Sequence, residues 1–166
     1  MRVLPYRMLP IAVATLLSAC VAQHPHPAST GFQLPAHRPG GPNPNDVLFR
    51  AIGLVGTPYR YGGNTPQSGF DCSGLVGFVF HDVAGVNLPR TAQEIADIDA
   101  PRVRRGELDS GDVVLFGKGH RVDHVGIYVG RGRFVHAPNT GGTVRLDTLD
   151  SPYWNDRYDG ALRIMR

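Results

Sequence analysis

The sequence predicts an α+β domain in residues 46–166, with helices at its start and an antiparallel sheet after them. Helical patterns lie before about residue 96, and β-rich runs punctuated by glycine follow one another from residue 112. Consecutive strands without helices between them are typical of an antiparallel sheet. The length suits one small domain with a single core.

The first predicted helix begins after Asn45 or Asp46, since either residue can cap a helix N-terminus. Its apolar residues recur at helical spacing, at Leu48, Ile52 and Val55. A glycine-rich loop over residues 56–71 then interrupts the helical pattern.

The apolar run in residues 75–80 fits a buried helix or a buried strand, because short apolar runs are ambiguous. The cap-forming Asp71 and apolar pairs four residues apart favour the helix. Cys72 would then lie in the first turn, where free N–H groups and the helix dipole stabilise a thiolate. The same N–H groups are suited to hold an oxyanion. A short helix is expected over residues 91–96.

The strands are expected over residues 112–116, 122–129, 133–137, 143–147 and 161–165, with a loop or short helix over residues 149–158. Side chains alternate between the two faces of a strand, so the turn at residues 130–132 decides whether His124 and His136 share a face. A two-residue turn would separate them. We expect an odd-length loop or a bulge, with Gly132 in the left-handed region. Asp123 then points away from His124.

The N-terminus resembles a bacterial lipoprotein signal. Residues 1–19 contain two arginines, no acid and an apolar run too short to span a bilayer. The sequence Leu17-Ser-Ala-Cys20 resembles a lipobox, in which Cys20 is acylated and anchors the mature chain to the membrane. By resemblance to sorting rules, Val21 in place of Asp favours the periplasmic face of a Gram-negative outer membrane.

Residues 20–45 are predicted to form a flexible tether with the lipidated cysteine at its start. Residues 21–45 contain six prolines, three histidines and few apolar residues, a composition that does not bury enough surface to fold. An extended chain of this length reaches at most ~80 Å. The histidines, at positions 24, 26 and 37, are expected to be solvated rather than to bind metal.

The charge excludes a nucleic-acid binder. Without the first nineteen residues the chain has 15 basic and 14 acidic residues, and no basic stripe or polybasic block remains. We therefore expect no nucleic-acid partner, and a monomer is favoured.

With Cys20 lipidated, Cys72 is an unpaired thiol in an exported protein. Such a cysteine forms an intermolecular bridge, lies inert in the core or is reactive. His124 and His136 supply the types of residue needed as a base and as a group that orients it.

The motifs, taken in order, resemble the NlpC-type cell-wall cysteine peptidases. They are Pro58-Tyr-Arg-Tyr-Gly-Gly63, Phe70-Asp-Cys-Ser-Gly-Leu75, Leu88-Pro-Arg90, Gly111-Asp-Val-Val-Leu-Phe116, His124-Val-Gly-Ile-Tyr128, Phe134-Val-His-Ala137 and Tyr153-Trp154. The resemblance implies a papain-like α+β fold whose nucleophile lies at a helix N-terminus. It also implies hydrolysis of peptidoglycan stem peptides without a metal or other cofactor.

By position, the resemblance makes Cys72 the nucleophile, His124 the general base and His136 the group that orients His124. Tyr59 would support the active site near the oxyanion. Asp71 and Ser73 would contact the stem peptide, although Asp71 is equally suited to cap the helix and Ser73 to occupy its first turn.

The predicted function is a peptidoglycan endopeptidase that cleaves the D-alanyl–meso-diaminopimelate cross-link. The γ-D-glutamyl–diaminopimelate bond within one stem is the alternative substrate. Three other classes stay open: a zinc site of Cys72, His124 and His136, a non-catalytic wall-binding lipoprotein, and a lipid acyltransferase of related fold.

Overall fold

The structure is a computed structural model that describes residues 41–139 and 142–165. Its elements are α1 (Pro44–Ile52), β1 (Asn64–Thr65), β2 (Gly69–Phe70), α2 (Cys72–Ala84), α3 (Ala92–Ala96), β3 (Arg102–Val103), the 3-10 helix η1 (Arg105–Glu107), β4 (Val113–Lys118), β5 (Arg121–Gly130), β6 (Arg133–His136), β7 (Arg145–Thr148), α4 (Pro152–Arg157) and β8 (Tyr158–Leu162). Helices α1, α2 and α3 precede the six-stranded sheet, as predicted, although a two-stranded hairpin of β1 and β2 lies in the loop before α2. Signal peptide, Cys20 and most of the tether lie outside the described residues.

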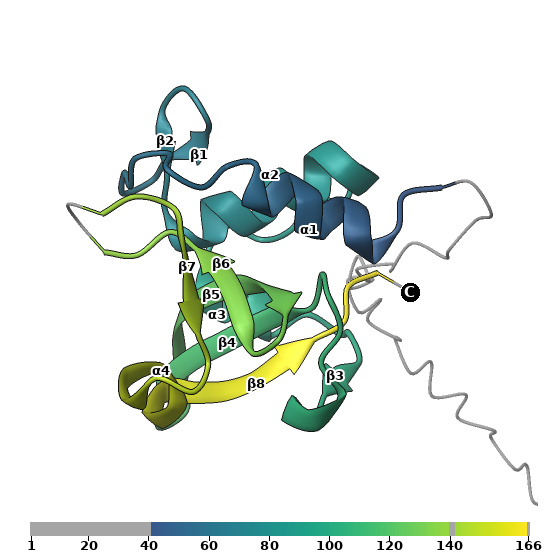
Figure 1. Cartoon of the computed structure of the whole chain (residues 1–166), viewed down its shortest axis with the longest axis vertical. Helices are drawn as coiled ribbons and strands as arrows, with labels where there is room; N and C mark the ends of the chain where they lie inside the picture. Colours follow the sequence, from purple (N-terminus) through teal and green to yellow (C-terminus); the bar gives the residue numbers. More distant parts are fainter. Residues whose placement is uncertain (1–40, 140–141, 166) are drawn as a thin grey trace, which may run out of the picture. The chain divides into compact units, whose positions relative to one another are not determined.

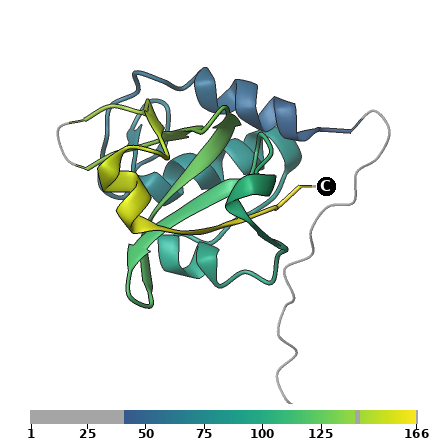
Figure 2. The same ribbon diagram turned by 60° about the horizontal axis from the view of Figure 1, so that its bottom comes forward.

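The larger sheet has the strand order β3-β8-β4-β5-β6-β7, and every neighbouring pair in it is antiparallel. Helices α1 and α2 lie along one side of this sheet, and α4 lies at one end of it (Figure 1). The turned view shows α4 again at the end of the sheet, with the yellow strand β8 running within the sheet (Figure 2). The α+β fold with helices packed on an antiparallel sheet is therefore confirmed.

Apolar side chains fill both faces of the sheet. The face toward α2 carries Val125 and Ile127, which belong to the main core with Leu75 and Val79 of the helix. The opposite face has a smaller cluster built on Phe116 and covered by Trp154 of α4, among other residues. Because both faces are covered, the central strands read as apolar runs rather than as a strict alternation.

The first helix differs from the sequence prediction. Asn43, rather than Asn45 or Asp46, caps α1, and Asp46 completes a capping box by accepting a hydrogen bond from the Asn43 backbone. The buried face consists of Val47, Ala51 and Leu54, whereas Ile52 and Val55 are exposed. The predicted face was wrong by one residue, because Val47 and Ala51 show the same helical spacing as the predicted Leu48 and Ile52.

The last two predicted strands are also displaced. Strand β7 begins two residues later than expected, and β8 covers Tyr158–Leu162 rather than 161–165. Tyr158 pairs with Phe116 across a bulge in the ladder, so tertiary pairing extends β8 toward α4. The sequence showed only the apolar end of this strand.

The turn between β5 and β6 places both histidines on one face, as expected. Tyr128 is opposite Phe134 and Gly130 is opposite Arg133, so Val129 is an extra residue in β5. Gly132 has φ +69°, in the left-handed region. The bulge thus offsets the two-residue turn of Arg131 and Gly132, and this part of the prediction is confirmed.

A close backbone contact fixes the start of α2. A Cβ atom on Gly74 would lie 2.1 Å from the carbonyl oxygen of Gly63, so no larger residue fits without movement of the backbone. This approach presses the loop before β1 against the first helical turn, which carries Cys72. The position of the thiol therefore depends on a residue without a side chain.

We predict that Gly74→Ala lowers the free energy of unfolding by about 1–3 kcal/mol, because the added methyl group overpacks this contact. Gly77→Ala is the matched control, since nothing lies within 4 Å of its Cβ position in the same helix. Its better helix propensity should raise stability by up to about 1 kcal/mol. Urea unfolding of both variants measures the difference, and equal stabilities would contradict the packing argument.

Candidate active site

A cavity of about 620 Å³ opens beside the N-terminus of α2. Its lining includes the predicted residues Tyr59, Asp71, Cys72, Ser73 and His124. The loop before β1 supplies Tyr59, the start of α2 supplies Cys72, and β5 supplies His124. The structure therefore brings the predicted groups together from separate parts of the chain. His136 lies behind His124 and is fully buried.

The Cys72 thiol is protonated at neutral pH. Burial raises its pKa above the ordinary value of 9.0, and the nearby Asp71 carboxylate raises it further. The backbone N–H groups of Val125, Ser73 and Cys72 act in the opposite direction, and they are outweighed. The stabilising amides that we predicted are thus present at the helix N-terminus, but burial decides the resting state. Val125, whose amide lowers the pKa of the thiol, directly follows His124 in β5.

His124 and His136 form a buried pair of neutral imidazoles. Nε2 of His124 lies 2.9 Å from Nδ1 of His136, and only 8% of His124 is exposed. Burial lowers the pKa of His124 to about 3, helped by His136 and by Arg157 and Arg145. Burial likewise lowers the pKa of His136 to about 4, although a neighbouring carboxylate opposes the shift. Both rings are therefore uncharged at pH 7.

The carboxylate beside His136 is Asp147, which the sequence analysis missed. Its Oδ2 atom lies 3.0 Å from Nε2 of His136 and accepts hydrogen bonds from Trp154 Nε1 at 2.8 Å and Arg145 Nη2 at 3.0 Å. Burial raises the pKa of Asp147, but the hydrogen bonds from Trp154, Arg145 and His136 lower it more, so the carboxylate is ionised.

His124, His136 and Asp147 form a hydrogen-bonded series, and this series determines the tautomer of each imidazole. An ionised carboxylate only accepts, so Nε2 of the neutral His136 carries the proton and its Nδ1 is an acceptor. Nε2 of His124 must then donate to that acceptor. Nδ1 of His124 is left unprotonated, which is the form a general base requires.

Trp154 connects this series to α4. Its indole ring stacks on His124 with centroids 5.0 Å apart and an interplanar angle of 27°, while its N–H group binds Asp147. The Trp154 side chain therefore holds both the His124 ring and the Asp147 carboxylate in place. Tyr153-Trp154 was recognised in the sequence only as part of a motif, because nothing local to α4 indicates these distant contacts.

Tyr59 keeps its phenolic proton in this environment. Burial raises its pKa, and negative charge on Cys72 or Asp71 would raise it further. Tyr59 and Cys72 line the same cavity, so the Tyr59 hydroxyl is available as a hydrogen-bond donor at the cavity wall. This position agrees with the predicted supporting role, which stays a prediction.

Asp71 and Ser73 have partners within the protein. The Asp71 carboxylate caps α2 through Gly74 N at 2.7 Å and forms a two-point ion pair with Arg90 at 2.7 and 2.8 Å. The Ser73 hydroxyl donates to the Arg90 carbonyl oxygen at 2.6 Å. These contacts support the capping interpretation of Asp71, while contact of either residue with a substrate stays a prediction.

Asp123 does not contact His124 through a hydrogen bond. Its carboxylate accepts from Arg157 Nη2 at 2.6 and 2.7 Å, as expected for a residue that does not orient the base. His81 and His120 are exposed. Across residues 41–139 and 142–165, no group of three or more His, Cys, Asp or Glu residues is placed to hold a metal ion. No helix in these ranges is long and apolar enough to cross a membrane.

Comparison with known proteins agrees with the resemblance found in the motifs. Over 143 residues the chain is 45% identical to murein DD-endopeptidase MepH of Escherichia coli, covering 83% of this chain and 52% of MepH. It is also 36% identical over 171 residues to the E. coli protein named murein DD-endopeptidase MepS/murein LD-carboxypeptidase, covering 93% of this chain and 89% of that protein. The chain thus spans about half the length of MepH and most of MepS.

The fold is shared with solved structures. A Bacillus cereus protein of the NlpC/P60 family aligns with a TM-score of 0.70 and 28% identity, over 81% of this chain and 43% of that one. The model of the NlpC/P60 family matches residues 56–163, which include the loop with Tyr59, the start of α2 and both histidine-bearing strands. The chain therefore belongs to the NlpC/P60 family.

Proposed function

We propose that this protein is a peptidoglycan endopeptidase that hydrolyses stem-peptide amide bonds with Cys72 as its nucleophile. The observation that carries the proposal is the shared cavity of Cys72 and His124, with His124 hydrogen-bonded to His136 and held in the tautomer of a base. The names of the E. coli relatives, both murein DD-endopeptidases, support the substrate class.

The first half of the reaction forms a thioester. Nδ1 of His124 takes the thiol proton, and the sulfur of Cys72 attacks the carbonyl carbon of the amide. The oxyanion is stabilised by N–H groups at the start of α2 and by the Tyr59 hydroxyl. When the tetrahedral intermediate collapses, the carbon–nitrogen bond breaks and the departing amine receives the proton from His124.

The second half restores the enzyme. His124 removes a proton from water, the oxygen attacks the thioester carbon, and the carbon–sulfur bond breaks. The thiolate then regains its proton from His124. His136 and Asp147 move no atom in either half. They keep the ring oriented and stabilise the positive charge that His124 carries between the two proton transfers.

The cross-link between D-alanine and meso-diaminopimelate is the bond that we favour, in keeping with the activity for which MepH and MepS are named. Lipidation at Cys20 and the tether of residues 20–45 would hold the domain at the periplasmic face of the outer membrane, within reach of the wall. The charged lining of the cavity, which includes Asp71, Arg90 and Arg121, suits a polar stem peptide better than the acyl chain of a lipid acyltransferase substrate.

Digestion of purified sacculi tests this proposal. Wild-type protein should release muropeptides whose masses identify cleavage of the cross-link, with activity unchanged by a chelator. Cys72→Ser should lose at least about a thousandfold in rate, because removal of the nucleophile leaves only binding and oxyanion stabilisation. Gly77→Ala serves as a folded control with an intact site.

Equal release by wild type and Cys72→Ser would indicate a non-catalytic wall-binding protein or another nucleophile. Loss of activity in chelator would instead favour the zinc alternative. Fragments cut between γ-D-glutamate and diaminopimelate would support the thiol mechanism but show that the enzyme cleaves the alternative bond.

Asp147→Asn tests the orienting group beyond His136. The substitution preserves the shape of the side chain. It removes the negative charge that stabilises the protonated His124 ring during the reaction. We expect kcat to fall by about 10- to 100-fold with KM nearly unchanged, by analogy with groups that hold a reactive residue in place. A merely structural role predicts reduced stability with normal kcat in the folded fraction, and that result would contradict a positioning role for Asp147.

A further inference from the structure

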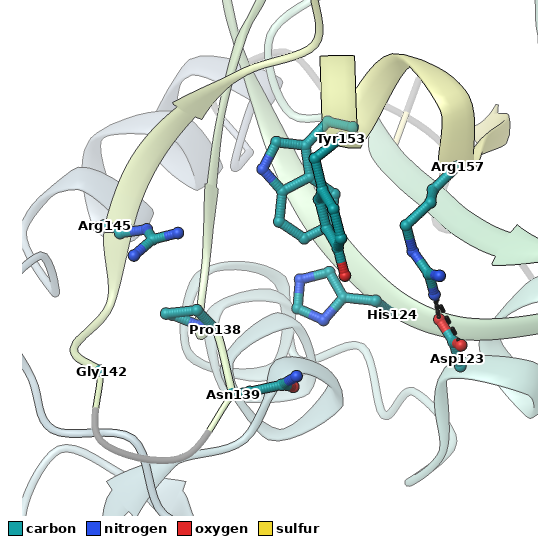
Figure 3. A pocket seen from close by; sticks show the side chains of 9 residues that line it. Asp123, His124, Pro138, Asn139, Gly142, Arg145, Tyr153 and Arg157 are labelled. Carbon is teal, nitrogen blue, oxygen red and sulfur yellow. Dashed lines mark hydrogen bonds and ion pairs between the residues drawn. The ribbon is translucent and has the colours of Figure 1, made fainter. Parts of the chain in front are cut away.

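A second cavity, of about 600 Å³, borders His124 but not Cys72. It shares Asp123, His124 and Asn139 with the cavity of the thiol. Its remaining walls include Arg145 at the start of β7 and Arg157 from α4. Figure 3 shows these two arginines on opposite sides of the His124 ring. A substrate that occupies both cavities therefore passes the imidazole.

The chemistry of thiol hydrolysis distinguishes the two cavities. The acyl carbon must reach the sulfur of Cys72, whereas the departing amine must reach His124 to receive a proton. The acyl part therefore occupies the cavity that both residues line. The cavity that borders only His124 is the place for the departing part of the substrate.

Arg145 is the more exposed of the two arginines in this second cavity, and it keeps an accessible donor. Its Nε and Nη2 atoms lie 3.3 and 3.0 Å from Oδ2 of Asp147, and Nη1 has no hydrogen-bond partner among the described residues. The side chain is 53% exposed. The ion pair thus fixes one edge of the guanidinium group and leaves the other edge available to a ligand.

Arg157, the other arginine of this cavity, is paired with Asp123. Its Nη2 atom donates to both oxygens of Asp123, at 2.6 and 2.7 Å, and its side chain is only 15% exposed. The dashed contacts in Figure 3 join these two side chains at the edge of the cavity. Nε of Arg157 has no partner among the described residues, but it is buried. Arg145, with the more exposed side chain, is therefore the better placed of the two arginines to bind an anion.

We propose that the second cavity binds the departing part of the substrate and that Arg145 binds a free carboxylate beside the departing amine. Guanidinium N–H groups form charge-assisted hydrogen bonds with carboxylates. This inference rests on the proposed hydrolysis and adds a residue that determines which amide bond is selected.

A free carboxylate in this position distinguishes the two candidate bonds. In the D-alanyl–diaminopimelate cross-link, the carbon that carries the departing amine also carries a free carboxylate. In the γ-D-glutamyl–diaminopimelate bond of a tetrapeptide stem, the carboxyl group beside that amine is itself joined in an amide. Arg145 therefore favours cleavage of the cross-link.

The test uses two synthetic cross-linked peptides that differ at one group. One has a free carboxylate on the carbon that carries the scissile nitrogen, and the other has a primary carboxamide there. We expect wild-type protein to prefer the carboxylate by about tenfold or more in kcat/KM, as for a charge-assisted hydrogen bond. Arg145→Gln should bring the ratio close to one, and Arg145→Lys should retain part of it.

Arg133→Gln is the matched control, because Arg133 is an exposed arginine of the same sheet that lines neither cavity. It should retain the wild-type ratio. If the substitution of Arg145 disturbs Asp147 and slows the reaction in general, both peptides are affected equally. The ratio of their kcat/KM values then does not change. A wild-type ratio near one, or an unchanged ratio in Arg145→Gln, would overturn the inference.

Failure of the proposed function gives a separate result. If neither peptide is cleaved, the hydrolysis is wrong, and binding of meso-diaminopimelate and its diamide to the protein decides whether the anion site exists. Tighter binding of the free acid by wild type than by Arg145→Gln, measured by calorimetry, supports the site. Equal affinity of the two ligands, or no binding of either, rejects it.

Discussion

The candidate active site depends on the burial of two neutral imidazoles. The rings of His124 and His136 are hydrogen-bonded to each other, and His136 is hydrogen-bonded to the ionised carboxylate of Asp147. Burial lowers the pKa of both rings, so neither is charged at rest, and Asp147 can only accept a hydrogen bond. Donor and acceptor roles then follow along the series from Asp147 to His136 to His124. In the proposed reaction, the same carboxylate that sets the tautomers also stabilises the charge that develops on His124.

The surrounding fold supplies each member of this series from a different element. The bulge at Val129 aligns His124 with His136, the pairing of β6 with β7 brings Asp147 beside them, and α4 contributes the stacked Trp154. On the other side of the sheet, the contact of Gly74 with Gly63 sets the start of α2, where Cys72 lies. Cys72 and His124 therefore line one cavity, although one belongs to a helix and the other to the sheet.

Much of this arrangement could be predicted from the sequence, because the relevant signals are local. The cap at Asp71, the glycine-rich turn and the alternation around His124 each depend on neighbouring residues. Asp147 and Trp154 were missed as parts of the hydrogen-bonded series, since their contacts arise from strand pairing and from packing of α4 on the sheet. The face of α1 was wrong for a related reason, as two sets of apolar residues had helical spacing and only the core selects between them.

The ¹⁵N chemical shifts of the histidine side chains, followed by NMR from pH 8 to pH 5, test the account most directly. We predict that His124 and His136 remain neutral throughout, because their pKa values are lowered to about 3 and about 4. Both rings should carry the proton on Nε2, leaving Nδ1 of His124 as the acceptor. An imidazolium at His124 near pH 7, or a proton on its Nδ1 atom in the neutral ring, would contradict the account.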